Sequence, residues 1–293
     1  MMNKLIVASC IGFLMFSCKS EETDAKKTVD IQTEKDTVPS EPMHEIVYAV
    51  PSPSEQHDLL YMLGGEVNPA YTNPLSRMSE YTTPEAKALN FGVYLSDAAY
   101  MMRFKQGKKV FLDYVSSLDK MGNELDISQV YGKDLIKEVE EAGGDAEKLF
   151  ELSSRNYLEV FDQMIEKDKG KELSLILSGA WIETMYILFE SSGKFNEHLE
   201  IQTSITEQRA VLENLIAFVS EFNEHESVKE IQGKLEKILA KYDDLDCEET
   251  QARLEDKGDN SFVLHGGTSC VFTKESYKEM KDLIRETRKS IVL

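Results

Sequence analysis

Two acidic residues lie among aromatic side chains on the most apolar segments of the chain. Asp97 follows Gly92 by about one helical turn, and Glu183 follows Gly179 in the same way. If these acids face inward they must be paired or hydrogen-bonded, because an isolated buried charge is very costly. Tyrosine hydroxyls are suitable donors around a polar pocket. This interpretation gives the candidate ligand-binding residues Asp97, Glu183, Tyr94, Tyr100, Trp181 and Tyr186.

The same two acids also have a purely structural interpretation. They can lie on the outer, solvated stripe of their helices, or they can lock neighbouring helices together through buried pairing. The two interpretations differ in one consequence. A pocket predicts that Asp97→Ala abolishes ligand binding while the protein stays folded, whereas a lock predicts that the variant unfolds.

Metal chemistry finds little support in the spacing of the ligand-type residues. A di-iron bundle requires Glu-x-x-His on its helices, and the motif occurs only at Glu41 and His44, on either side of Pro42. The acidic connector from Asp244 to Glu255 partly matches a calcium loop, but Glu249 stands where that loop requires glycine. We therefore expect neither a metal site nor a cofactor.

Catalytic motifs are also missing from the sequence. There is no G-x-S-x-G nucleophile elbow and no H-E-x-x-H zinc motif, and Gly193-Lys194 is followed by Phe195 rather than by the Ser or Thr of a phosphate-binding loop. We therefore expect no catalytic residues and treat the chain as a protein that is not an enzyme.

The first 18 residues contain a second kind of chemistry. After Lys4, an apolar run of 12 residues from Leu5 to Phe16 leads to Ser17-Cys18. A spanning helix needs about 20 apolar residues, so this run fits the core of a cleaved signal peptide covering residues 1–17. Cys18 is then the predicted lipidation site, and fatty acyl chains such as palmitate would hold the protein on a membrane.

The segment Leu14-Met15-Phe16-Ser17-Cys18 resembles the loose lipobox of Bacteroidetes lipoproteins. It departs from the stricter motif because Met15 stands where an aliphatic residue is usual. Lys19, Glu21 and Glu22 are similar to the short signal that exports such lipoproteins to the cell surface. The resemblance implies an outer-membrane lipoprotein, with surface display slightly favoured over a periplasmic position.

Composition limits the partners of the chain. The formal net charge is −20, with 53 acidic and 33 basic residues. Nucleic acid binding needs a basic face that releases counterions from phosphates, and no Lys or Arg cluster here is free of nearby acids. We therefore expect the membrane, reached through lipid on Cys18, and either an envelope protein or a small ligand as partners.

Cys247 and Cys270 are the two cysteines that follow Cys18. In an oxidising compartment they can close a loop that contributes about 3 kcal/mol to stability. Neither belongs to a C-x-x-C unit, so a disulfide is a better interpretation than a redox or metal pair.

The remaining sequence predicts a helical body behind a tether. Residues 18–45 are polar, acidic and proline-containing, which indicates a disordered tether. From 46 to 293 we expect one helical domain, because apolar residues recur at three- and four-residue steps. Helices are expected over 54–63, 84–106, 108–122, 128–142, 145–169, 171–191, 195–222, 227–243 and 273–290.

These segments predict an all-α, up-and-down multi-helix bundle. A small hairpin insert, from the β-prone residues 261–264 to Cys270-Val271-Phe272, is expected before the last helix. The similar segments around Gly92 and Gly179 also suggest two pseudo-repeated halves, in which the glycines let neighbouring helices approach closely.

The segments 50–55, 88–97 and 179–183 resemble an uncharacterised group of helical Bacteroidetes lipoproteins, and residues 90–97 are the most specific part. The resemblance extends over most of the chain after the tether. It implies a helical fold and an envelope location but no activity. Three hypotheses follow, in order: a lipid-anchored helical binding or scaffold module, a lipoprotein that binds a small molecule or metal around Asp97 and Glu183, and an enzyme.

Overall fold

The computed structural model describes residues 51–62, 68–102, 107–127, 133–143, 145–258 and 261–292. The predicted signal peptide, Cys18 and the predicted tether lie outside these residues. Contacts within the chain separate Met1–Glu41 from a compact unit, Pro42–Leu293, to which all of the described residues belong.

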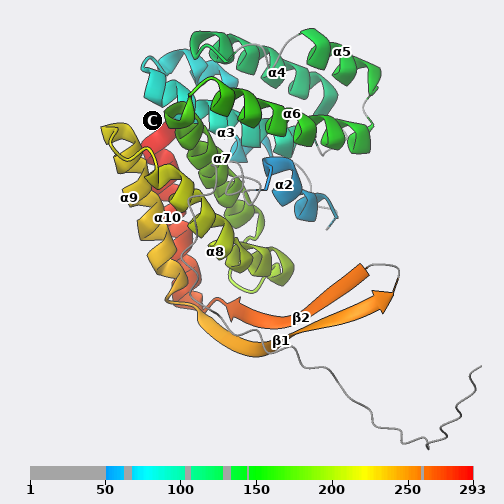
Figure 1. The fold of residues 1–293 in the computed structure, drawn as a ribbon, viewed down its shortest axis with the longest axis vertical. Helices are drawn as coiled ribbons and strands as arrows, with labels where there is room; N and C mark the ends of the chain where they lie inside the picture. The colour runs from blue at the N-terminus through cyan, green and yellow to red at the C-terminus, as the bar shows by residue number, and fades with distance from the viewer. Residues whose placement is uncertain are drawn as a thin grey trace, which may run out of the picture. The chain divides into compact units, whose positions relative to one another are not determined.

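The described unit is an all-helical bundle with one two-stranded sheet (Figure 1). Two short 3-10 turns, η1 (Pro69–Tyr71) and η2 (Leu75–Glu80), lie between the first two described helices. The helices are α2 (Pro53–Met62), α3 (Pro84–Met102), α4 (Gly107–Glu124), α5 (Lys133–Glu141), α6 (Ala146–Glu166), α7 (Gly170–Ser191), α8 (Leu199–Ser220), α9 (Glu226–Tyr242) and α10 (Lys274–Val292). The predicted fold class is therefore confirmed.

Helices α3 and α7 form the centre of the bundle, and they pack on each other more extensively than any other described pair of helices. A Cβ on Gly92 would lie 1.9 Å from the carbonyl oxygen of Ile176, and a Cβ on Gly179 would lie 2.0 Å from that of Leu89. Only glycine permits this approach. Because residue numbers rise together along the contact, the two helices run in the same direction.

The centre of the bundle is apolar because the helices that form it consist mainly of apolar residues. On α7, Leu175, Ile182, Met185 and Leu188 are all fully buried. This helix is long and apolar enough to cross a membrane by length and composition alone, yet 89% of its most apolar stretch is buried inside the unit. Burial within the bundle accounts for its composition, because the core helix of a soluble domain is also apolar on all sides.

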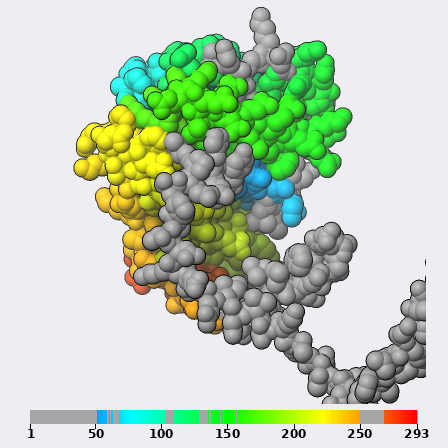
Figure 2. Space-filling view, viewed as in Figure 1, coloured from blue at the N-terminus to red at the C-terminus, as the bar shows by residue number. Residues whose placement is uncertain are grey.

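Helices α3, α6 and α10 begin at side-chain caps. Thr83 accepts from the backbone N–H of Ala86 at the start of α3, and Asp145 caps α6. Helix α10 begins with a reciprocal cap in which Thr273 and Ser276 bond each other's backbone N–H. In the space-filling view the green residues of α4 to α6 lie at one end of the described body, with the yellow and orange residues from the end of α8 through α9 below them (Figure 2).

The hairpin between α9 and α10 is longer than the sequence indicated. Strands β1 (Asp246–Gly258) and β2 (Ser261–Val271) pair antiparallel, and Cys247 and Cys270 are cross-strand neighbours joined by a disulfide. The acidic connector, expected to be irregular, is therefore strand β1. Asp, Glu and Lys have low strand propensity, and pairing with β2 overrides it.

Candidate functional site

The close packing of α3 on α7 brings the two predicted acids together. Asp97 and Glu183 are both fully buried, and their carboxyl groups share a hydrogen bond. Beside them the hydroxyls of Ser96 and Thr184 lie 2.8 Å apart. The polar residues of the two central helices thus meet across the same interface that the glycines close.

Arg288, on the C-terminal helix α10, completes the cluster. Its Nε and Nη2 donate to the two carboxylate oxygens of Glu183 at 2.6 and 2.7 Å. Its guanidinium carbon lies 4.1 Å from the centre of the Tyr186 ring. A bidentate pair with a ring against it is the arrangement for which a guanidinium is suited. The last helix is therefore attached to the core by a buried ion pair.

Asp97 differs from Glu183 in what surrounds it. The backbone N–H of Asn73 donates to Oδ2 at 2.9 Å, whereas no N–H or hydroxyl of the described residues donates to Oδ1. Burial first, and the neighbouring charge of Glu183 second, hold the pKa of Asp97 well above its ordinary value. Burial also raises the pKa of Glu183, but Arg288 opposes that effect. Of the two carboxyl groups, Asp97 therefore holds a proton more readily than Glu183.

A second polar chain enters the core from α2. His57 is fully buried, and its Nε2 lies 3.1 Å from Oγ of Ser96, which in turn contacts Thr184. Burial lowers the pKa of His57 to about 3, so its ring is neutral at physiological pH. Sequence reasoning missed both Ser96 and His57. Ser96 directly precedes Asp97, and this was the only local signal.

The aromatic candidates lie in three different settings. Tyr186 contacts Arg288 and so belongs to the cluster. The hydroxyl of Tyr94 donates to the carbonyl of Pro74 at 3.1 Å, and that of Tyr100 accepts from the backbone N–H of Asn68 at 3.1 Å. These two tyrosines therefore fix the segment before α3. Trp181 is buried in the core, and its indole N–H has no partner among the described residues.

Three cations on α10 contact α7. Besides Arg288, Arg285 forms a two-point pair with Glu190 at 2.6 and 3.0 Å. Lys281 donates to the carbonyl oxygens of Phe189 and Gly193 at 2.5 and 2.9 Å, and burial lowers its pKa. Lys281 thereby satisfies carbonyls that the end of α7 leaves without helical partners.

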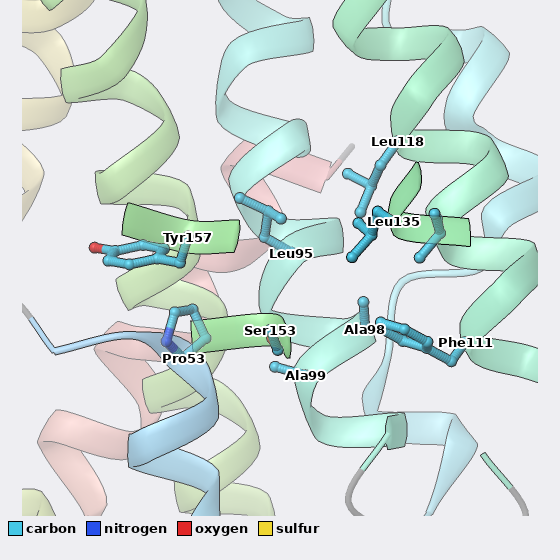
Figure 3. A pocket seen from close by; sticks show the side chains of 10 residues that line it. Pro53, Leu95, Ala98, Ala99, Phe111, Leu118, Leu135, Ser153 and Tyr157 are labelled. Carbon is cyan, nitrogen blue, oxygen red and sulfur yellow. The ribbon is translucent and has the colours of Figure 1, made fainter. Parts of the chain in front are cut away.

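Among the described residues, Asp97 and Glu183 have no exposed surface. A small apolar cavity of about 30 Å³ lies between α2, α3, α4, α5 and α6, and neither acid lines it (Figure 3). Its wall includes Leu95, Phe111 and Tyr157. Within the described parts of the chain, no group of three His, Cys, Asp or Glu residues is arranged to hold a metal ion. The arrangement of Asp97, Glu183 and Arg288 is therefore suited to holding the helices together.

Comparison with known proteins adds no assignment. No family model matches the chain, and neither the curated proteins nor the solved structures include a significant match. The resemblance to helical Bacteroidetes lipoproteins therefore stays a prediction, as does the duplication of the Gly92 and Gly179 segments.

Proposed function

We propose that the protein is a lipid-anchored lipoprotein of the bacterial outer membrane whose helical domain is a non-catalytic binding or scaffold module. The observation that carries the proposal is Ser17-Cys18, directly after an apolar run that is too short to span a bilayer. The acidic, polar residues that follow suit a tether between the lipid and the domain. Lys19, Glu21 and Glu22 favour display at the cell surface.

The core of the domain supports a scaffold role over a catalytic one. Arg288 pairs with Glu183, Asp97 accepts from the backbone of Asn73, and His57 is held neutral against Ser96. A general acid or base must reach its substrate within hydrogen-bonding distance. The alternative function, a ligand pocket around Asp97 and Glu183, would need a path to two side chains that are fully buried.

Acylation of Cys18 is the decisive test. Cells expressing the protein are fed a clickable palmitate analogue, and the purified chain is analysed for label and for its intact mass. We expect label on the wild type, a chain that begins at Cys18, and loss of both in Cys18→Ala. Cys10→Ala is the matched control, because Cys10 lies inside the apolar run and would be removed with it.

Two outcomes would overturn the proposal. The first is an unlabelled wild-type chain that retains Met1, and the second is equal labelling of Cys18→Ala and the wild type. Protease treatment of intact cells tests the surface position separately. Digestion of the domain in intact cells supports display outside, whereas protection until the outer membrane is opened contradicts it.

A further inference from the structure

A groove of about 540 Å³ lies between η2, the start of α3 and the second half of α4. It is separate from the carboxyl cluster, and neither Asp97 nor Glu183 lines it. Its volume falls in the range of about 300 to 1,000 Å³ that is typical of small-molecule sites. The lining residues are Leu75, Ser76, Met78, Ser79, Tyr81, Thr82, Lys87, Ser117, Lys120, Met121 and Glu124.

The wall of this groove is held in place by contacts behind it. The Tyr81 hydroxyl accepts from Nδ2 of Asn73 at 2.8 Å and donates to the carbonyl of Val292 at 3.2 Å. Lys87 of α3 pairs with Glu124 of α4 at 2.5 Å, which joins the two helices. A preorganised wall lowers the entropic cost of binding a ligand.

Four hydroxyls and one ammonium group that line the groove have unused hydrogen-bonding capacity. The hydroxyls of Ser76, Ser79, Thr82 and Ser117 make no hydrogen bond within the part of the chain that the structure describes. Lys120 is exposed and makes no ion pair with any described residue. Glu124, the acid among the lining residues, is already paired with Lys87. Lys120 thus gives the groove a local positive charge on a chain whose net charge is −20.

The floor of the groove is apolar and adaptable. Met121 is buried, and Met78 and Leu75 are half-buried beside it. Methionine side chains fill irregular contacts easily, which suits a flexible apolar group. An apolar floor beneath hydroxyls and one free ammonium is complementary to a molecule that combines a short apolar body with an anionic head.

We propose that this groove binds a small amphipathic anion, a carboxylate or phosphate on an apolar chain, with the anion on Lys120 and the apolar part on Met78 and Met121. Fatty acids and lysophospholipid-type phosphates share this chemistry. The proposal goes beyond the lipoprotein assignment and does not depend on it. Failure of Cys18 acylation would leave it standing.

Equilibrium dialysis of radiolabelled octanoate tests the groove. The full-length chain in lipid nanodiscs is compared with empty nanodiscs, and octyl phosphate and octanol compete as unlabelled probes. We expect saturable octanoate binding that is displaced by octyl phosphate and not by octanol at the same concentration. Tighter binding of octanoate indicates a carboxylate ligand, and tighter binding of octyl phosphate indicates a phosphate ligand. Absence of saturable binding by either anion, or equal displacement by octanol, overturns the proposal.

Two pairs of variants localise the binding. Lys120→Glu should weaken octanoate binding at least tenfold, whereas Lys229→Glu makes the same charge change on an exposed site of α9 and should leave binding unchanged. Ser117→Trp should block the groove, and Ser116→Trp, one position away and exposed, should not. Unchanged circular dichroism shows that each variant is folded. Equal effects within either pair contradict the assignment.

Discussion

At the residue scale, the distinctive feature of the molecule is a carboxyl pair that holds one proton beside one arginine. Asp97, Glu183 and Arg288 are then neutral as a group, because the proton on Asp97 removes the charge that Arg288 does not balance. A buried group with no net charge avoids most of the cost of taking ions out of water. Each member depends on the other two, so the cluster behaves as a unit.

Replacing Arg288 tests this dependence. Arg288→Met leaves buried Glu183 without its cation, and we expect the free energy of unfolding to fall by about 3 kcal/mol at neutral pH. Arg285→Met is the matched control, because Arg285 also pairs with a glutamate of α7 but its side chain is 46% exposed against 14% for Arg288. That variant should lose less than about 1 kcal/mol. Urea unfolding measures both, and equal losses would show that burial of the pair is unimportant.

Asp97→Asn tests where the proton resides. Because burial and Glu183 raise the folded-state pKa of Asp97, the stability it contributes is complete below its ordinary value of 3.8 and is lost as pH rises through the folded pKa. Asparagine can donate to Glu183 without titrating. We therefore expect the variant to gain on the wild type as pH rises from 4 to 8, by at most about 1.4 kcal/mol per pH unit. A stability difference that is constant with pH would place the proton elsewhere.

At the scale of elements, the glycines of α3 and α7 set the distance at which the acids meet. The tightest contacts are backbone to backbone, since each missing Cβ faces a carbonyl of the other helix. Side-chain rearrangement alone does not relieve such contacts. The interface is therefore rigid, and the polar residues one turn beyond it are held in register.

Gly179→Ala should separate the two helices. The new Cβ would lie 2.0 Å from the carbonyl oxygen of Leu89, and we expect a loss of about 3 kcal/mol or more, seen as a lower Tm. Gly233→Ala on α9 is the control, because a Cβ there meets nothing within 4 Å. It should stabilise its helix by up to about 1 kcal/mol. If both variants had the same Tm, close packing of α3 on α7 would not be a determinant of stability.

Periodicity and caps predicted most of the helices because these signals are local. The sequence placed the start of this helix at residue 84, and α3 begins at Pro84 with Thr83 as its cap. Arg288 was missed because its partner is 105 residues away and no local pattern relates the two. Strand β1 was missed because its charged composition is untypical of strands, and only pairing with β2 makes it one.

At the scale of the whole molecule, an excess of negative charge acts on a core that is itself neutral. The formal net charge is −20, whereas Glu183 in the core is paired with Arg288. Repulsion therefore acts mainly among exposed acids, where water and salt reach it. Exposed ion pairs oppose this repulsion only weakly, because each contributes about 0 to 1 kcal/mol.

Screening should consequently stabilise the folded protein. The Debye length falls from about 30 Å at 0.01 M salt to about 3 Å at 1 M, which removes the long-range repulsion first. We expect Tm to rise over that range of NaCl. Glu166 and Glu221 are exposed acids at the C-terminal ends of α6 and α8, where the helix dipole also disfavours them. The double variant Glu166→Gln and Glu221→Gln should raise Tm at 0.01 M NaCl and reduce the gain at 1 M. A Tm that falls with salt in the wild type would show that attractive pairs outweigh the net charge.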